Sequence, residues 1–251
     1  MKPRVLVLRA AGTNCDRETA HAFELVGCTA ERIHLNRIVE SPALLDDYQL
    51  LAIPGGFSYG DDISAGRIFA NQIMQRLGGA MHGFVSKGKP VIGICNGFQV
   101  LVKTDLLPGP LAGVSGQSCT LAANDCGHFV DHWVRLDPKG SKCMWTRGLS
   151  RVELPIAHGE GKFLTANDGV RQALWANGQV ALTYVDDEPS PNGSVDHIAG
   201  ICDQTGLVFG LMPHPERHVS PLQHYDWTSR TCQPEEGDGL AIFRNAANHV
   251  A

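Results

Sequence analysis

The sequence predicts an α/β protein built on a single open, mostly parallel sheet flanked by helices. Over the first hundred residues, short aliphatic runs alternate with segments whose apolar residues recur at helical spacing, as in a parallel sheet with covering helices. After residue 111 the strand-like runs follow one another through turns, which indicates some antiparallel strands in the C-terminal half. We therefore expect one domain, residues 1–251.

The N-terminal half is expected to contain two helices between its strands. Asp16 is expected to cap the first, which carries Ala20 and Phe23 on one face and ends at Gly27. The second spans residues 66–85, and the paired glycines at 78 and 79 are expected to kink or divide it. The expected strands are RVLVL (4–8), AERIHL (30–35), LLAIP (50–54) and PVIGI (90–94).

The C-terminal half is expected to continue the same sheet, with a hairpin turn at DQTG (203–206) and a closing helix at 240–250. Two tracts crowded with turn-forming residues, 186–194 and 220–239, are expected to be flexible loops. The expected strands are SCTLA (118–122), HWVRL (132–136), RVELPIA (151–157), VALTYV (180–185), IAGICD (198–203) and LVFGLMP (207–213).

Composition narrows the class of function. The chain has 251 residues, of which 43% are hydrophobic and 19% charged, and its net charge is -5, which argues against a nucleic-acid binder because such proteins usually carry a basic face. No apolar run approaches the roughly 20 residues of a membrane-spanning helix, and the N-terminal VLVL is too short for a signal peptide. We expect a cytoplasmic protein that binds neither nucleic acid nor membrane.

Eight cysteines are scattered along the chain without a C-x-x-C pair. This spacing supports neither a structural zinc site nor a redox pair, and we expect most of these thiols to be small core residues and no metal to be bound.

Cys95 has a distinctive setting in VIGICNGFQVL (91–101), between an expected strand and an expected helix. Gly93 and Gly97 flank it and make a sharp strand-to-helix turn possible, the pattern of a nucleophile elbow with cysteine in the place of serine. The helix N-terminus would favour the thiolate. Burial as a plain core residue is the competing interpretation, and a catalytic cysteine additionally needs an oriented base.

His214 and Glu216, in LMPHPERH, are the best candidates for that base and its partner. Pro215 favours an extended backbone at His214, and residues two apart in an extended chain face the same side. Glu216 would then hold one imidazole nitrogen while the other faces Cys95. His-x-Glu also begins the zinc deaminase signature, but no Pro-Cys-x-x-Cys follows, so that interpretation fails.

Two glycine-containing segments complete the set of candidates. Gly55 and Gly56, in PGGFSYGDD, let backbone N–H groups approach a ligand at the end of a strand, although an ordinary turn would look the same. The segment is not a phosphate loop, because G-x-x-x-x-G-K-[ST] is absent. His158, in AHGEGKF (157–163), is expected to contact substrate or to shape a loop.

These motifs together resemble the class I, triad-type glutamine amidotransferases, and among them the glutaminases of phosphoribosylformylglycinamidine synthases from purine biosynthesis. The resemblance spans nearly the whole chain and implies a flavodoxin-like architecture. Its motifs, in order, are GTNCDRE, IPGGFSYGDD, GICNGFQ, PIAHGEGKF, YVDDEPSPNGS with IAGI, and MPHPER.

The resemblance implies that Cys95 attacks the side-chain amide of glutamine, while His214, oriented by Glu216, transfers the protons. Ammonia leaves, and water hydrolyses the γ-glutamyl thioester to glutamate. The N–H groups of Gly56 and Asn96 would hold the oxyanion. The substrate glutamine would be contacted by Gly55, Gln99, His158 and Gly159.

A partner is implied as well, because this chain carries no nucleotide loop and is too short to hold a synthetase. The ammonia would pass to an ATP-dependent large subunit that converts formylglycinamide ribonucleotide to formylglycinamidine ribonucleotide, accompanied by a small accessory subunit. No cofactor is expected in this chain, whereas ATP and magnesium are expected on the synthetase. We expect the glutaminase to be weakly active until the partner docks.

Other interpretations remain open on the sequence alone. They are another class I amidotransferase, a γ-glutamyl hydrolase, a cysteine hydrolase without glutamine preference, and a non-catalytic regulatory module that kept only the fold. AHGEG and GGFSYGD favour the purine enzyme. RAAGTNCD departs from the proline-glycine or acidic stretch common in relatives, and the tract after Glu216 is long for the family.

Overall fold

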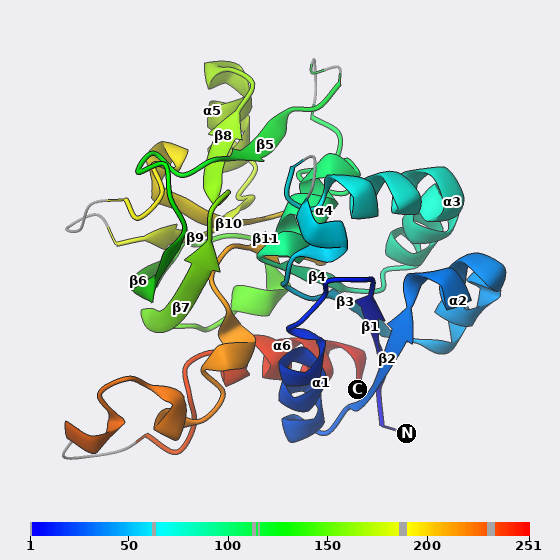
Figure 1. The fold of residues 1–251 in the computed structure, drawn as a ribbon, viewed down its shortest axis with the longest axis horizontal. Coiled ribbons are helices and arrows are strands. Elements are labelled where there is room, and N and C mark those ends of the chain that lie inside the picture. The colour runs from blue at the N-terminus through cyan, green and yellow to red at the C-terminus, as the bar shows by residue number, and fades with distance from the viewer. Residues whose placement is uncertain (1, 62–63, 112–113, 115, 186–189, 230–233) are drawn as a thin grey trace.

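The computed structural model describes residues 2–61, 64–111, 114, 116–185, 190–229 and 234–251. Its main feature is a nine-stranded sheet of order β2-β1-β3-β4-β11-β10-β9-β6-β7, with a separate two-stranded sheet of β5 and β8 (Figure 1). The strands are β1 Arg4–Arg9, β2 Thr29–His34, β3 Leu50–Ile53, β4 Val91–Ile94, β5 Cys119–Ala122, β6 Val130–Pro138, β7 Val152–His158, β8 Lys162–Thr165, β9 Val180–Tyr184, β10 Ile198–Cys202 and β11 Val208–Leu211.

The sheet changes direction at β11. Strands β2, β1, β3, β4 and β11 are parallel to one another, and β10, β9, β6 and β7 follow in antiparallel pairs. This confirms the predicted α/β class and the antiparallel strands of the C-terminal half. The buried runs of β3 and β4 carry apolar residues on both faces, as expected of central parallel strands covered by helices on both sides.

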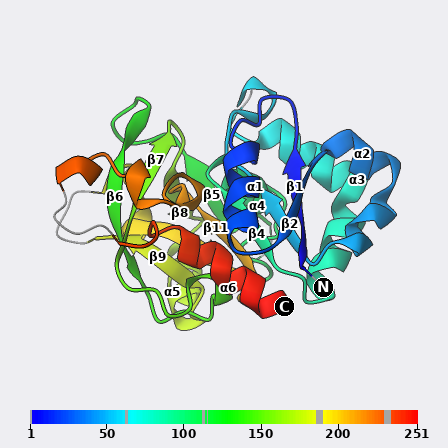
Figure 2. The same cartoon turned by 90° about the horizontal axis from the view of Figure 1, so that it is seen from below.

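Helices cover both faces of the parallel half. α1 and α6 pack together on one face, and α3 and α4 pack together on the other (Figures 1 and 2). The helices are α1 Asp16–Leu25, α2 Leu35–Glu40, α3 Arg67–Ser86, α4 Asn96–Lys103, α5 Asp168–Ala176 and α6 Leu240–Val250. No helix among the described residues is long and apolar enough to cross a membrane.

Several expectations about elements need correction. Asp16 is the first residue of α1 and not its cap, and its carboxylate instead pairs with Arg9 and Arg32. α3 continues through Gly78 and Gly79 as one helix, because its buried face on either side of them holds it in place. β5 leaves the main sheet to pair with β8, and the sequence pattern did not reveal α2, β8 or α5.

The two expected flexible loops lie only partly within the described residues, because residues 186–189 and 230–233 fall outside them. The described part of the second tract forms short 3-10 turns at Pro221–Gln223 and Trp227–Ser229.

The order of the parallel strands positions the site. Ile53 lies beside Gly93 in the β3–β4 register, and Leu211 lies beside Ile94 in the β11–β4 register. The three strands therefore end at one edge of the sheet, and the segments that follow them begin side by side. These segments contain Gly55, Cys95 and His214.

Candidate active site

Cys95 occupies the sharp turn between β4 and α4, as predicted. Its backbone angles, φ 51° and ψ -105°, are strained for a residue with a side chain. The surroundings impose this conformation: the Cys95 N–H donates to Leu211 O at 2.8 Å. A Cβ on Gly97 would lie 1.8 Å from Ile53 O, so only glycine lets α4 start this close to β3.

His214 and Glu216 form a buried pair beside this turn. The two residues are 2% and 1% exposed, and His214 Nδ1 lies 2.7 Å from Glu216 Oε1. The backbone at His214 is extended, as predicted, but Glu216 reaches back from a 3-10 turn, Pro215–Arg217, and not along an extended chain. The N–H of His214 donates to Pro155 O of β7 at 2.8 Å, which fixes the pair against that strand.

The charges around His214 favour its protonated form. Burial lowers its pKa, but the neighbouring Glu216 and Cys95 outweigh burial, and the pKa stands well above its ordinary value. Because Nδ1 is held by Glu216, the buried Nε2 is the nitrogen left for Cys95, and it has no hydrogen-bond partner among the described residues. The arrangement suits proton transfer between Cys95 and a group leaving from the same side.

The glycine loop after β3 lies against the side chains of both Cys95 and His214. A Cβ on Gly55 would lie 2.8 Å from His214 Cε1 and 3.5 Å from Cys95 Cβ. Gly56 has φ +139°, and its N–H has no backbone acceptor among the residues that the structure describes. The N–H of Asn96, at the first position of α4, has no acceptor within its helix. Two backbone N–H groups without a backbone acceptor among the described residues therefore follow the ends of β3 and β4.

Asn96 and Gln99 are held in one polar network. Ser58 Oγ donates to Asn96 Oδ1 at 2.6 Å, and Asn96 Nδ2 donates to Gln99 Oε1 at 3.0 Å. Gln99 Nε2 in turn donates to Glu160 O at 2.6 Å. This chain of bonds connects the elbow helix to the segment after β7, so Gln99 is already oriented towards the AHGEG segment.

His158 and Gly159 lie in that segment. The ring of His158 is buried against Gly161, with Nδ1 3.2 Å from Asn124 Oδ1. Burial, together with the positive charge of His214, lowers its pKa to about 4. Gly159 accepts a backbone hydrogen bond from Asn124 N. The group of this strand that reaches Cys95 is the carbonyl of Ala157, 3.7 Å from Sγ.

Sequence reasoning missed Cys15 and Arg217, because it treated Cys15 as an ordinary core thiol. Cys15 Sγ lies 4.0 Å from His214 Nδ1 and accepts from Arg217 at 3.1 Å. The available signal was position: Cys15 follows β1, which ends at the same edge of the sheet as β3 and β4.

Cys15, His214 and Glu216 are the one group of side chains among the described residues whose ligand atoms are close enough together to hold a metal ion. Cys15 Sγ, His214 Nδ1 and a carboxylate oxygen of Glu216 lie within 4.8 Å of one another. The hydrogen bond between His214 and Glu216, and the guanidinium against the sulfur, already account for this arrangement without a metal.

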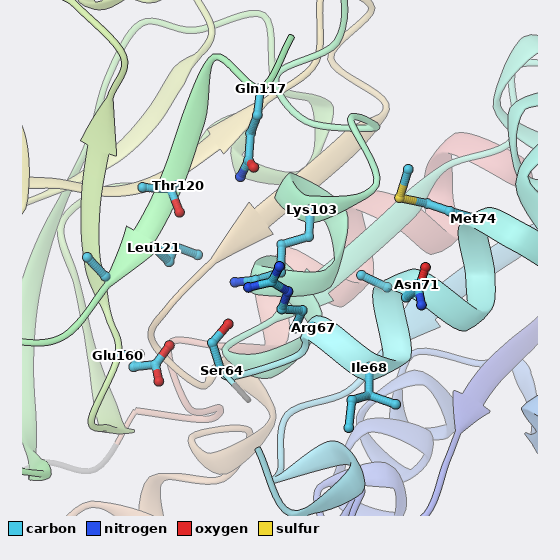
Figure 3. A pocket seen from close by; sticks show the side chains of 12 residues that line it. Ser64, Arg67, Ile68, Asn71, Met74, Lys103, Gln117, Thr120, Leu121 and Glu160 are labelled. Atoms are coloured by element: carbon cyan, nitrogen blue, oxygen red, sulfur yellow. The ribbon is translucent and has the colours of Figure 1, made fainter. Parts of the chain in front are cut away.

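A cavity of about 680 Å³ opens next to Glu160, the residue whose carbonyl accepts from Gln99. Figure 3 shows the side chains that line it. It lies between α3, the end of α4 and β5, and Glu160 lines it. Arg67 and Lys103 point into it (Figure 3), and neither pairs with a carboxylate among the described residues. The cavity thus presents two cationic side chains to a ligand.

Comparison with known proteins gives a consistent result. Residues 2–250 match the sequence model of the CobB/CobQ-like glutamine amidotransferase domain. Phosphoribosylformylglycinamidine synthase subunit PurQ of Dehalococcoides mccartyi is 45% identical over 252 residues, which cover 98% of this chain and 96% of that protein. The subunit of the same name from Treponema denticola is 44% identical over 241 residues, covering 87% and 89%.

Solved structures show the same similarity in three dimensions. A chain in the structure of PurLQS from Thermotoga maritima matches with a TM-score of 0.77 and 32% identity, and each chain covers 100% of the other. A glutamine amidotransferase from Methylobacillus flagellatus shares the fold, with a TM-score of 0.54 at 18% identity over 100% of this chain and 92% of that one.

Proposed function

This chain belongs to the CobB/CobQ-like glutamine amidotransferase family, and from that premise we infer that it is the glutaminase subunit of a phosphoribosylformylglycinamidine synthase. It hydrolyses glutamine and delivers the ammonia to the PurL synthetase, which forms formylglycinamidine ribonucleotide in purine biosynthesis. We propose that residues 1–251 work as one amidotransferase domain, which the family match over residues 2–250 supports. A cytoplasmic setting fits the seven described cysteines, all of which are free.

The observation that carries the mechanism is a strained cysteine at a helix N-terminus beside a buried His–Glu pair. We propose that Cys95 attacks the amide carbon of glutamine while the N–H groups of Gly56 and Asn96 hold the oxyanion. His214 gives its proton to the leaving nitrogen, so ammonia departs and the γ-glutamyl thioester remains. His214 then takes a proton from water, which attacks the thioester and releases glutamate.

The assignment is tested by formylglycinamidine ribonucleotide formation in a complex of this chain with the PurL synthetase, ATP and glutamine. Cys95→Ala is expected to abolish glutamine use, whereas free ammonia is expected to support the reaction with or without this chain. Cys28→Ala, which removes a buried thiol far along the chain from the elbow, is the matched control and should remain active. Glutamine use by Cys95→Ala would overturn the mechanism.

Dependence on the partner is measured in the same preparations. We expect the chain alone to release ammonia from glutamine more slowly than the complex does, because unused ammonia would waste glutamine. Equal turnover with and without the synthetase would contradict this expectation.

A further inference from the structure

The segment that follows β1 interlocks with the glycine loop that follows β3. Phe57 N donates to Gly12 O at 3.0 Å, Tyr59 N donates to Ala11 O at 2.7 Å, and Cys15 N donates to Gly55 O at 3.3 Å. A Cβ on Gly12 would lie 2.0 Å from Phe57 O, so the two segments touch with no space between them. The glycine loop therefore takes its shape from the residues before α1.

The hydrogen bond from Cys15 determines where the neighbouring N–H points. In a trans peptide the carbonyl of one residue and the N–H of the next point in opposite directions from one plane. Because Cys15 N–H holds the Gly55 carbonyl from one side, the N–H of Gly56 must project to the other. Gly56 N–H is one of the two proposed oxyanion donors.

The side chain of Cys15 lies next to His214, the proposed base of the same site. Cys15 is 1% exposed, and its sulfur lies 4.0 Å from His214 Nδ1. The thiol donates to Asn14 Oδ1 at 3.2 Å and accepts from Arg217 at 3.1 Å. Arg217 directly follows Glu216 in the sequence, and its guanidinium is held by the Cys15 sulfur and by Glu18, whose carboxylate lies 3.8 Å from Arg217 Nε. Without the sulfur, the guanidinium would keep only the longer contact with Glu18, and it would then compete with His214 for the Glu216 carboxylate.

We propose that Cys15 is a positioning residue for the glutaminase reaction, whose sulfur keeps Arg217 away from the His214–Glu216 pair beside the backbone bond that orients the Gly56 N–H. This inference rests on the proposed function. It also gives a role to the GTNCDRE segment, which contains neither a triad residue nor a proposed oxyanion donor.

The proposal predicts a change in the pH profile as well as in rate. The charged or titratable groups that face His214 are Glu216 from its own turn, Cys95 from the elbow, Cys15 from the start of α1 and His158 from β7. Arg217 in turn lies against Cys15, Glu216 and Glu18. If Arg217 turns to Glu216, His214 loses part of the charge that keeps it protonated. The alkaline limb of glutamine-dependent activity should then move to lower pH.

The test compares Cys15→Ala, Cys15→Ser and the control Cys28→Ala in the complex with the synthetase. For Cys15→Ala we expect kcat with glutamine to fall roughly 10- to 100-fold, as small misplacements in a site do. KM should change little, and the alkaline limb should shift to lower pH. Cys15→Ser keeps an acceptor for Arg217 and should recover part of the rate and of the pH profile. Ammonia-dependent synthesis should be equal in all preparations.

Two results would overturn the proposal. One is an unchanged kcat in Cys15→Ala. The other is an equal loss in the alanine and serine variants with the pH profile unmoved, which would indicate only a packing role. Both differ from failure of the proposed function itself, which would appear as glutamine use by Cys95→Ala.

Discussion

The surroundings of single residues in the site shift their pKa values to different extents, and His158 is a clear case. Its buried ring has Nε2 without a hydrogen-bond partner among the described residues. Burial lowers its pKa from 6.5 to about 4. The folded protein therefore binds fewer protons at His158 than the unfolded chain does between these two pH values.

We predict that His158 makes the protein sensitive to acid. Its neutral form contributes stability that is fully present above pH 6.5 and is lost as the pH falls to about 4. The loss is about 3 kcal/mol over that range. Urea unfolding at pH 7 and at pH 4.5 should show a smaller decrease for His158→Gln than for the native chain. Parallel decreases in the two proteins would contradict the prediction.

Single site residues could be predicted from the sequence where their distinctive features lie in the residues next to them. Cys95 between two glycines and His214 between two prolines could be recognised from their neighbours alone. Cys15 could not, because its partner Arg217 is remote in the sequence and only the strand order brings the two together.

Among the elements, α4 and α3 show opposite uses of glycine. Gly97 lies where a Cβ would be 1.8 Å from Ile53 O, whereas Gly78, within α3, has nothing within 4 Å of such a Cβ. The first glycine is required by close approach, and the second only lowers helix propensity.

We therefore predict that the two glycine-to-alanine substitutions act in opposite directions. Gly97→Ala should separate α4 from β3 and remove glutamine-dependent activity together with stability. Gly78→Ala should raise the free energy of unfolding by about 0.5–1 kcal/mol, because alanine is the better helix former. Denaturant unfolding of both variants measures this, and a destabilised Gly78→Ala would show that the glycine has a packing role in α3.

The elements that the sequence did not reveal are short. α5 buries only Val170 and Leu174, and β8 has four residues, so neither gives a long hydrophobic period. By contrast α6, with its five buried residues at helical spacing, was predicted with the bounds that the structure shows.

The molecule as a whole brings α3, α4 and β5 together around the cavity with Arg67 and Lys103 (Figure 3). Burial, and the charge of Arg67, lower the pKa of Lys103. Glu160 lines the same cavity, and its carbonyl accepts from Gln99, one turn of α4 from Asn96. A zwitterion such as free glutamine has a carboxylate for the cations and an ammonium group for Glu160.

We predict that Lys103→Met and Arg67→Met each raise KM for glutamine, roughly 10-fold or more, as expected when a charge-assisted contact is lost. kcat should change less, and alkylation of Cys95 by iodoacetamide, which has no carboxylate to bind, should proceed at the native rate. Lys87→Met, in an exposed ion pair with Asp46, is the control. An unchanged KM in both cavity variants would exclude this role.

The two proposed catalytic residues are also synthesised at different times, because the neighbouring strands that carry them lie far apart in the sequence. Cys95 and His214 follow neighbouring strands, but one is made long before the other, and translation proceeds at roughly 5–20 residues per second. The thiol thus spends on the order of ten seconds outside the ribosome without its base. Because β11 must also pair beside β4 before the elbow is held, we expect a nascent or truncated chain not to consume glutamine. On the proposed mechanism, hydrolysis begins only when the sheet is complete.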